Sequence, residues 1–288
     1  MGKTAQQTGD RQLELAAHIY RRIEMRYLQK PFSHEDETAH FLQIAETARR
    51  EGFPHIRFQA LYGVFINYRF LIGNFELAFE YAHELDRLMR PLPPKEFPEK
   101  MKYFLEIADL FYKFEDYDKA KEYFDIIIAS PRIADEQLSL RGAYNNIGLI
   151  YRNHLNDLAL SDSMFTAVLN LPSPLEKKSD HVRVWDAIVK GNLGKNAFLR
   201  KEYDTAVPLL RFAMDTLPKF RDFNFAAGTA ITLADICLIQ GKIAEGKAYI
   251  DSARSLNNQQ PLVFSLSGNE QVLRLNGQCV DDICLHRF

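Results

Sequence analysis

The sequence predicts an all-α protein built from pairs of antiparallel helices that recur along the chain. The 288 residues are 47% hydrophobic and 26% charged, which is typical of a folded protein with an apolar core. Ala206, Leu210 and Ala213 lie at i, i+4 and i+7 and therefore share one helix face. The same pattern returns several times, so neighbouring helix pairs can cover each other's apolar faces.

The first helix pair is expected over residues 11–51, after a disordered N-terminus of residues 1–10. Ser33, followed by Asp36 three residues later, resembles a capping box and predicts that the second helix of this pair starts there. The apolar stripe of this second helix is expected at Phe41, Ala45 and Ala48.

The next five pairs share one arrangement of a first helix, a short elbow and a second helix. They are expected over residues 59–90, 101–131, 141–172, 181–218 and 225–257, with a partial pair over 262–288. The step from a usually small residue on each first helix to an anchor on the second is 12 positions. The anchors are Ala78, Ala120, Leu160, Ala206 and Gly246. Small residues suit these places because two helix backbones that cross closely leave no space for a large side chain.

These pairs resemble tetratricopeptide repeats, whose pattern includes L-G-x-x-Y, a later A-x-x-x-F and a terminal proline. The strongest matches are residues 101–131 and 187–218, whereas Leu160, Ile66 and Arg69 depart from the pattern. The anchors lie 40 to 46 residues apart, which resembles the longer repeats of bacterial sensor and regulator arrays of this family. The resemblance implies a right-handed α-solenoid in which residues 11–288 form a single superhelical domain.

The resemblance also implies that the first helices line a concave groove for a peptide or protein segment. Carried over position by position, the groove residues are Asn67, Phe70, Lys102, Asp109, Tyr112, Asn145, Asn146, Arg152, Asn192, Lys195, Phe198 and Asp235. Asparagine amides both donate and accept, so they suit an extended peptide backbone. The alternative is that each of these residues is solvated or packs on the next pair. The Lys and Asn clamp by which cochaperone members grip a terminal carboxylate is absent, so binding of chaperone tails is not supported.

Charge and composition exclude several classes of function. The formal net charge is −2 with interleaved signs, so no global basic field attracts nucleic acid or an anionic membrane. The sequence contains no stretch of about 18 apolar residues, so no membrane-spanning helix is predicted. The N-terminus also lacks the apolar run of a signal peptide. Cys237, Cys279 and Cys284 are too few and too irregular for a disulfide framework or a zinc site. Free cysteines favour a cytoplasmic location, and Cys237 is expected in the core.

The short segments that resemble nucleotide-binding or metal-binding motifs lack the residue spacing that those motifs require. The tripeptide GKT at residues 2–4 lacks the rest of a phosphate-binding loop. His34 and His40 are six residues apart and fall on different helix faces, so they do not form a zinc helix motif. Arg21, Arg22 and Arg26 are expected on a solvated helix face. We therefore expect no catalytic residues, no metal and no cofactor.

Three functional hypotheses remain from the sequence. The first is a non-catalytic module that binds a protein or peptide, as the sensor or regulatory region of a larger bacterial signalling or transcription-regulator protein. The second is a scaffold that self-associates, for example as a homodimer, through its convex face or C-terminal end. The third is an enzyme within a helical array, which the absence of a catalytic constellation disfavours.

Overall fold

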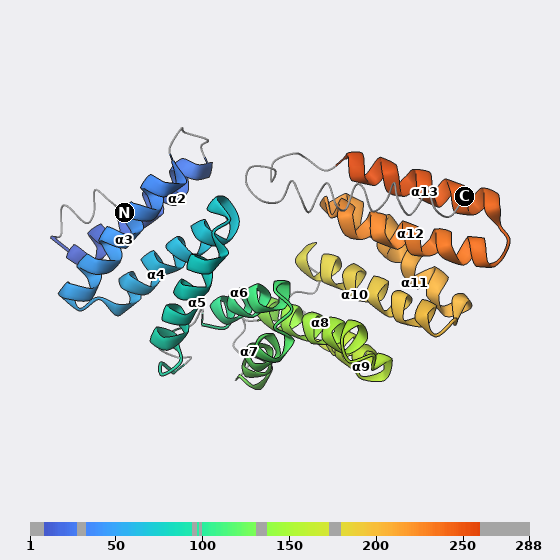
Figure 1. Cartoon of the computed structure of the whole chain (residues 1–288), viewed down its shortest axis with the longest axis horizontal. Helices are drawn as coiled ribbons and strands as arrows, with labels where there is room; N and C mark the ends of the chain where they lie inside the picture. Colours follow the sequence, from blue (N-terminus) through green and yellow to red (C-terminus); the bar gives the residue numbers. More distant parts are fainter. Residues whose placement is uncertain are drawn as a thin grey trace. The chain divides into compact units, whose positions relative to one another are not determined.

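The computed structural model describes residues 9–27, 33–93, 97, 100–130, 137–172 and 180–259 (Figure 1). Every regular element in these ranges is helical and none is a strand, so the predicted all-α fold of helix pairs is confirmed. The helices fall into two compact units. Unit 1 contains α2 to α5 and unit 2 contains α6 to α13. The GKT tripeptide, Cys279, Cys284 and the expected partial pair over 262–288 lie outside the described residues.

Unit 1 is built on α3, which packs against α4, with α5 on the other side of α4. Its elements are α2 (Arg11–Tyr27), α3 (His34–Glu51), α4 (Pro54–Ile66), the π-helical turn η1 (Asn67–Ile72) and α5 (Phe75–Met89). As predicted, Ser33 caps α3, because its Oγ accepts a 2.9 Å hydrogen bond from the Asp36 backbone N–H. The predicted stripe of Phe41, Ala45 and Ala48 is buried.

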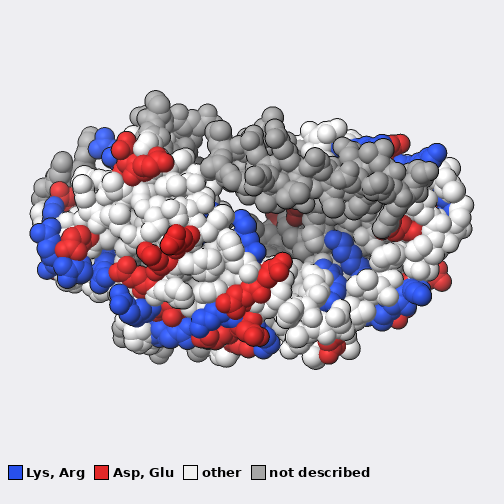
Figure 2. All heavy atoms as spheres, viewed as in Figure 1, with Lys and Arg blue, Asp and Glu red and all other residues white. Residues whose placement is uncertain are grey.

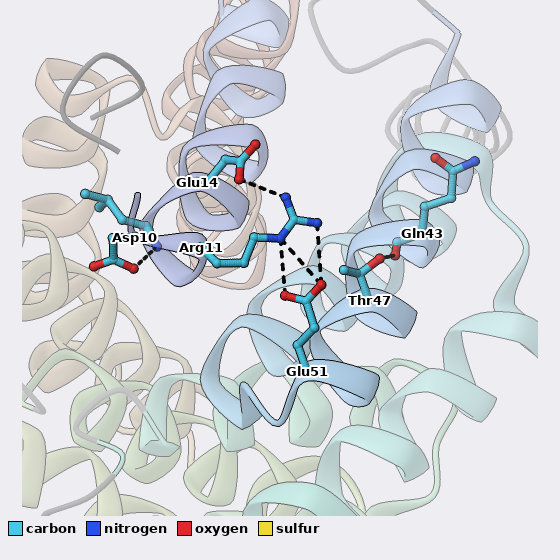
Figure 3. A network of polar contacts seen from close by, with 7 residues as sticks. Asp10, Arg11, Glu14, Gln43, Thr47 and Glu51 are labelled. Atoms are coloured by element: carbon cyan, nitrogen blue, oxygen red, sulfur yellow. Dashed lines mark hydrogen bonds and ion pairs between the residues drawn. The ribbon is translucent and has the colours of Figure 1, made fainter. Parts of the chain in front are cut away.

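An arginine at the start of α2 joins the helices of the first predicted pair (Figure 3). Arg11 Nε donates to Glu51 Oε2 over 3.2 Å, and its NH1 donates to Glu14 Oε2 over 2.8 Å. Asp10 accepts from the Leu13 backbone N–H over 3.0 Å and so caps α2. Because these groups are exposed, water and salt screen the ion pairs, and the contact fixes geometry more than it adds stability.

Unit 2 consists of four helix pairs in which each second helix also packs on the next first helix. The pairs are α6 (Lys100–Lys113) with α7 (Tyr117–Ala129), α8 (Gln137–Asn153) with α9 (Leu158–Asn170), α10 (Asp180–Leu199) with α11 (Tyr203–Thr216), and α12 (Phe223–Ile239) with α13 (Ile243–Asn258). A 3-10 turn, η3 (Leu217–Phe220), follows α11 and contains the predicted terminal Pro218. Each pair corresponds to one expected from the sequence.

The first helices of unit 2 lie closer to one another than the second helices do. Contacts join α6 to α8, α8 to α10 and α10 to α12, whereas the second helices of successive pairs make fewer contacts with one another. Closer spacing on one side of a stack makes the stack curve toward that side. We call the inner side of unit 2, formed by α6, α8, α10 and α12, the first-helix face.

The elbows of unit 2 repeat one backbone turn. The second residue before each second helix has a left-handed conformation, with φ between 53° and 73°, at Glu115, Asn156, Lys201 and Gly241. This turn lets a backbone N–H at the end of the elbow bond a carbonyl in the last turn of the first helix, as Glu202 N does to Ala197 O over 2.9 Å. The repetition comes from the backbone, because the four residues share no side-chain chemistry.

Close approach of two helix backbones explains the small residue at Gly194, as predicted. A Cβ added to Gly194 would lie 3.2 Å from the backbone oxygen of Ala206 and 2.9 Å from Leu210 Cγ. The α10 and α11 backbones therefore cross too closely for any side chain at this position.

The constant step of 12 residues is wrong for the α8–α9 pair. Leu160, the expected anchor, is 43% exposed, while Ser161 is fully buried and its Oγ donates to Gly148 O over 2.8 Å. The elbow here is one residue longer. Asp157 N reaches back six residues to Tyr151 O, whereas Glu202 N reaches back five. The extra residue moves the crossing from position 160 to position 161.

Polar and apolar side chains complete the core of unit 2. Arg141 is 1% exposed and donates to the carbonyls of Val168, Leu171 and Pro172, which lie in the last turn of α9 and directly after it. Cys237 is buried, as predicted.

None of the helices described is both long and apolar enough to cross a membrane. Likewise, no metal-binding group of three or more His, Cys, Asp or Glu side chains gathers within the described ranges.

Candidate functional site

A continuous chain of side-chain hydrogen bonds crosses three first helices of unit 2. Asn146 Nδ2 on α8 donates to Asp109 Oδ1 on α6 over 2.6 Å. Asn145 Nδ2 donates to Asn146 Oδ1 over 3.0 Å, and Asn192 Nδ2 on α10 donates to Asn145 Oδ1 over 2.9 Å. All three amides point the same way, so their dipoles align toward the Asp109 carboxylate. Each amide still has one N–H and one acceptor site beyond this chain.

Arg152 occupies the opposite end of this amide chain. Its NH1 donates to Asn192 Oδ1 over 3.2 Å and to Asn192 O over 3.5 Å, and its Nε donates to Asn153 Oδ1 over 2.9 Å. The guanidinium carbon also lies 5.8 Å from the centre of the Phe165 ring. Burial lowers the pKa of Arg152, and nearby Tyr112 partly opposes this effect. The amide chain therefore runs from a cation to an anion and holds both in place.

Lys195 lies one helical turn after Asn192 on α10. Its ammonium nitrogen is 4.6 Å from the centre of the Phe225 ring on α12, so α12 also contributes to the site. Burial lowers the pKa of Lys195 to about 8, and repulsion by Arg152 adds to the shift. Two partly buried cations from adjacent helices thus share one region of the first-helix face.

Tyr112 on α6 borders the same region. Burial raises the pKa of its hydroxyl, while the Asn153 side chain hydrogen-bonds to it and Arg152 lies near it. The Tyr112 ring makes an edge contact with Tyr117, with ring centres 5.6 Å apart. Tyr112 therefore lies beside Arg152 and packs against Tyr117.

Burial divides the amide chain into two layers. Asn192 and Asn145 are 1% and 6% exposed, so they position their neighbours and have almost no surface for a ligand. Asp109, Asn146 and Arg152 are only partly buried. The sequence prediction that all of these residues contact a ligand directly is therefore corrected for Asn145 and Asn192.

Three other predicted residues of unit 2 lie outside this network. Lys102 is exposed on α6, and Asp235 is partly buried on α12. Phe198 packs against the buried cluster that contains Ala206 and Leu210, which ties it to the hydrophobic core. Packing therefore accounts for the buried part of Phe198, and its contact with a ligand stays a prediction.

The two predicted residues of unit 1 also have different surroundings from those expected. Asn67 is fully buried, and its Nδ2 donates to Thr38 Oγ1 on α3 over 3.0 Å. It therefore has no surface for a ligand, and the prediction of a groove role for it is wrong. Phe70 is 47% exposed, and the Arg69 guanidinium carbon lies 4.4 Å from the centre of its ring.

Residues that the sequence analysis missed complete the site. Phe225 supports Lys195, and Asn153 orients Arg152. Asn196 is fully buried and donates to Ser161 Oγ over 2.9 Å and to Asp162 Oδ1 over 2.7 Å, which locks α10 onto α9. Asn196 lies one turn after Asn192, so both side chains share a helix face. This spacing could have predicted that Asn196 also contacts a neighbouring helix. Phe225 follows from no motif, since its role depends on how α12 packs on α10.

The surface charge elsewhere is mixed. Figure 2 shows Lys and Arg side chains interspersed with Asp and Glu over the described part of the face in view. Many cations of the helices are paired with a carboxylate, as Arg200 is with Asp162 at 2.8 Å. This interleaving is typical of solvated helix surfaces.

Comparison with known proteins adds a likeness of fold. No family model matches the chain, and no curated protein matches it. The crystal structure of BtubC (BKLC) from P. vanneervenii is 18% identical, with a TM-score of 0.60 over 79% of this chain and 92% of that one. The crystal structure of NprR in complex with its cognate peptide NprX is 12% identical, with a TM-score of 0.55 over 97% of this chain and 89% of that one. The chain is thus an all-helical repeat protein.

Proposed function

We propose that the first-helix face of unit 2 binds an extended peptide or protein segment without catalysing a reaction. The observation that carries this proposal is the amide chain from Asp109 to Arg152, with Asn146 partly exposed in its middle. A peptide backbone offers alternating donors and acceptors, and Asn146 retains one of each. Buried Asn145 and Asn192 hold these groups in fixed positions, which lowers the entropy lost on binding.

The likeness to NprR supports the same proposal. That structure holds a cognate peptide and covers nearly the whole of this chain. We further propose that the helix pairs are degenerate tetratricopeptide repeats, on the pattern quoted above, and that the protein acts as the sensing region of a regulator. The sequence predicts no nucleophile with a base beside it, which is what most enzyme sites require. The candidate site is instead made of amide and charged side chains held in fixed positions.

The experiment is a direct binding measurement with synthetic peptides. A pool of randomised heptapeptides is mixed with the purified protein, unbound peptides are removed by gel filtration, and retained peptides are identified by mass spectrometry. Asn146→Ala removes the exposed amide, whereas Asn170→Ala removes an exposed asparagine at the end of α9 and is the matched control. We expect retention by the wild type and Asn170→Ala, and about tenfold or more less retention by Asn146→Ala, as for the loss of two hydrogen bonds of about 1 kcal/mol each. Retention of no peptide, or equal retention by all three proteins, contradicts the proposal.

A further inference from the structure

Arg152 and Lys195 are two cations without a carboxylate partner in the described part of the chain. Arg152 donates only to asparagine oxygens, and Lys195 makes no hydrogen bond to any described residue. By contrast, the exposed cations Arg200 and Arg11 each have carboxylate partners. A partly buried cation without a counter-charge is unfavourable for folding, so its presence points to a use for the charge.

Part of the donor capacity of this cation pair is unused among the described residues. The Nε and NH1 groups of Arg152 are engaged by Asn153 and Asn192, which fixes the plane of the guanidinium and leaves NH2 without an acceptor in the described residues. The Lys195 ammonium group lies over the Phe225 ring, and none of its three N–H donors has an acceptor among the described residues. A fixed planar donor beside a flexible ammonium group can engage the two oxygens of one carboxylate.

The other charges nearby favour a single carboxylate over a polyanion. Asp109 lies at the far end of the amide chain, so a ligand with charge spread along its length is repelled there. The net charge of −2 and the mixed surface charge also oppose nucleic acid. A peptide with one acidic group placed at Arg152 is attracted by this cation and carries no negative charge near Asp109.

We infer that Arg152 and Lys195 form a subsite for a carboxylate of the bound peptide, supplied either by its C-terminus or by an Asp or Glu side chain. This inference rests on the proposed function and names the chemistry of the ligand. It differs from the cochaperone clamp, in which Lys and Asn come from one helix pair, because here the two cations come from two successive pairs, on α8 and α10.

The experiment compares four pools of synthetic heptapeptides with the full chain. One pool has free C-termini and includes Asp and Glu, the second has amidated C-termini and includes them, the third has free C-termini and excludes them, and the fourth lacks both kinds of carboxylate. Retention is measured by mass spectrometry for the wild type, Lys195→Met and Lys190→Met. Lys190 is the matched control because it lies on the same helix, with its ammonium 4.1 Å from the centre of the Phe212 ring.

We expect the wild type and Lys190→Met to retain the fourth pool at least about tenfold less than the best carboxylate pool, as befits the loss of a charge-assisted contact. Lys195→Met should lose this preference. Retention of the second but not the third pool identifies a side-chain carboxylate, and the reverse identifies the C-terminus. Retention of all pools equally by the wild type, with loss in Asn146→Ala, overturns the carboxylate subsite and leaves peptide binding intact. Retention of no pool overturns both.

A folding measurement keeps the result unambiguous. Lys195→Met removes a desolvated charge and preserves the length of the side chain, so its thermal midpoint should equal or exceed that of the wild type. A loss of the carboxylate preference in a variant that is at least as stable as the wild type supports a binding role. A variant with a midpoint several degrees lower shows that Lys195 holds the fold together, which contradicts the inference.

Discussion

Asn192 joins two first helices by accepting from Arg152 on α8 and donating to Asn145 on the same helix. The Asn192 side chain is 1% exposed, so no water replaces either partner if it is lost. The contact therefore couples the geometry of the candidate site to the packing of α10 on α8.

Replacement of this residue should lower stability. In Asn192→Ala, the Arg152 NH1 group loses its side-chain acceptor and Asn145 Oδ1 loses its donor. Each buried group left without a partner costs about 1–3 kcal/mol, so we expect a lower urea midpoint by circular dichroism. Asn224→Ala, at an exposed position of α12, should leave the midpoint unchanged. Equal midpoints for the two variants are incompatible with a structural role for the amide chain.

The contribution of Lys195 to stability should depend on pH. Its folded pKa is about 8, below the ordinary value of 10.5, because of burial and the Arg152 charge. Below pH 8 both states carry the proton, and the fold bears the full cost of the buried charge. As pH rises from 8 toward 10.5, the folded state releases the proton first, so this group's destabilising effect is relieved.

The measurement is the free energy of unfolding of the wild type minus that of Lys195→Met, from pH 7 to pH 10. We expect this difference to rise toward zero or above as pH increases. The charge that adds to this shift is Arg152 on the neighbouring helix, and an arginine stays protonated throughout this range. A difference that is flat with pH rules out the depressed pKa, and Lys190→Met gives the background slope.

Two glycines on first helices should respond to alanine in opposite directions. At Gly194 the new Cβ would contact the Ala206 backbone oxygen at 3.2 Å, which a side-chain movement cannot relieve, so overpacking should cost about 1–3 kcal/mol. At Gly228 the nearest atom would be Lys195 Nζ at 3.7 Å, an ordinary contact. Alanine there should stabilise α12 by about 0.5–1 kcal/mol. Thermal unfolding of both variants tests this, and a shift in the same direction for both is inconsistent with close crossing at Gly194.

Arg141 should matter for the end of α9. Arg141→Met removes the donor to the carbonyls of Val168, Leu171 and Pro172, of which Val168 O keeps the Leu171 backbone N–H, and we expect a loss of about 1–3 kcal/mol. Because burial lowers the pKa of Arg141, removal of its charge recovers part of that loss. Hydrogen exchange should show faster exchange at the C-terminal turn of α9 than at α13. Unchanged protection at α9 would contradict the capping role.

The helices were predictable from the sequence because their signals are local. The cap at Ser33, the stripe of α3 and the small residues at Gly194 and Ala206 act within one helix or one pair, and the structure places each as expected. The elbow turn was less visible, since Glu115 and Lys201 adopt the left-handed conformation that glycine prefers. There the helix packing on both sides overrides the residue preference.

The site was only partly predictable, for a different reason. Matching of repeat positions found Asp109, Asn146 and Arg152, which the structure joins in one network, and Lys195, which lies one turn after Asn192 of that network. It did not separate these from Asn145 and Asn192, because burial depends on the distance between successive pairs. It also misplaced Asn67, whose partner Thr38 lies 29 residues earlier and follows from no repeat pattern.

The longer elbow before α9 has a consequence for how such chains diverge. Ser161 takes the place of position 160 at the crossing because its side chain is only one oxygen larger than that of alanine and its hydroxyl donates to Gly148 O. Insertion of one residue therefore rotates the second helix by one position instead of disrupting the pair, provided that the next side chain is small. A lineage can gain or lose single codons in its elbows and keep its architecture, while comparisons that assume a fixed period lose the match.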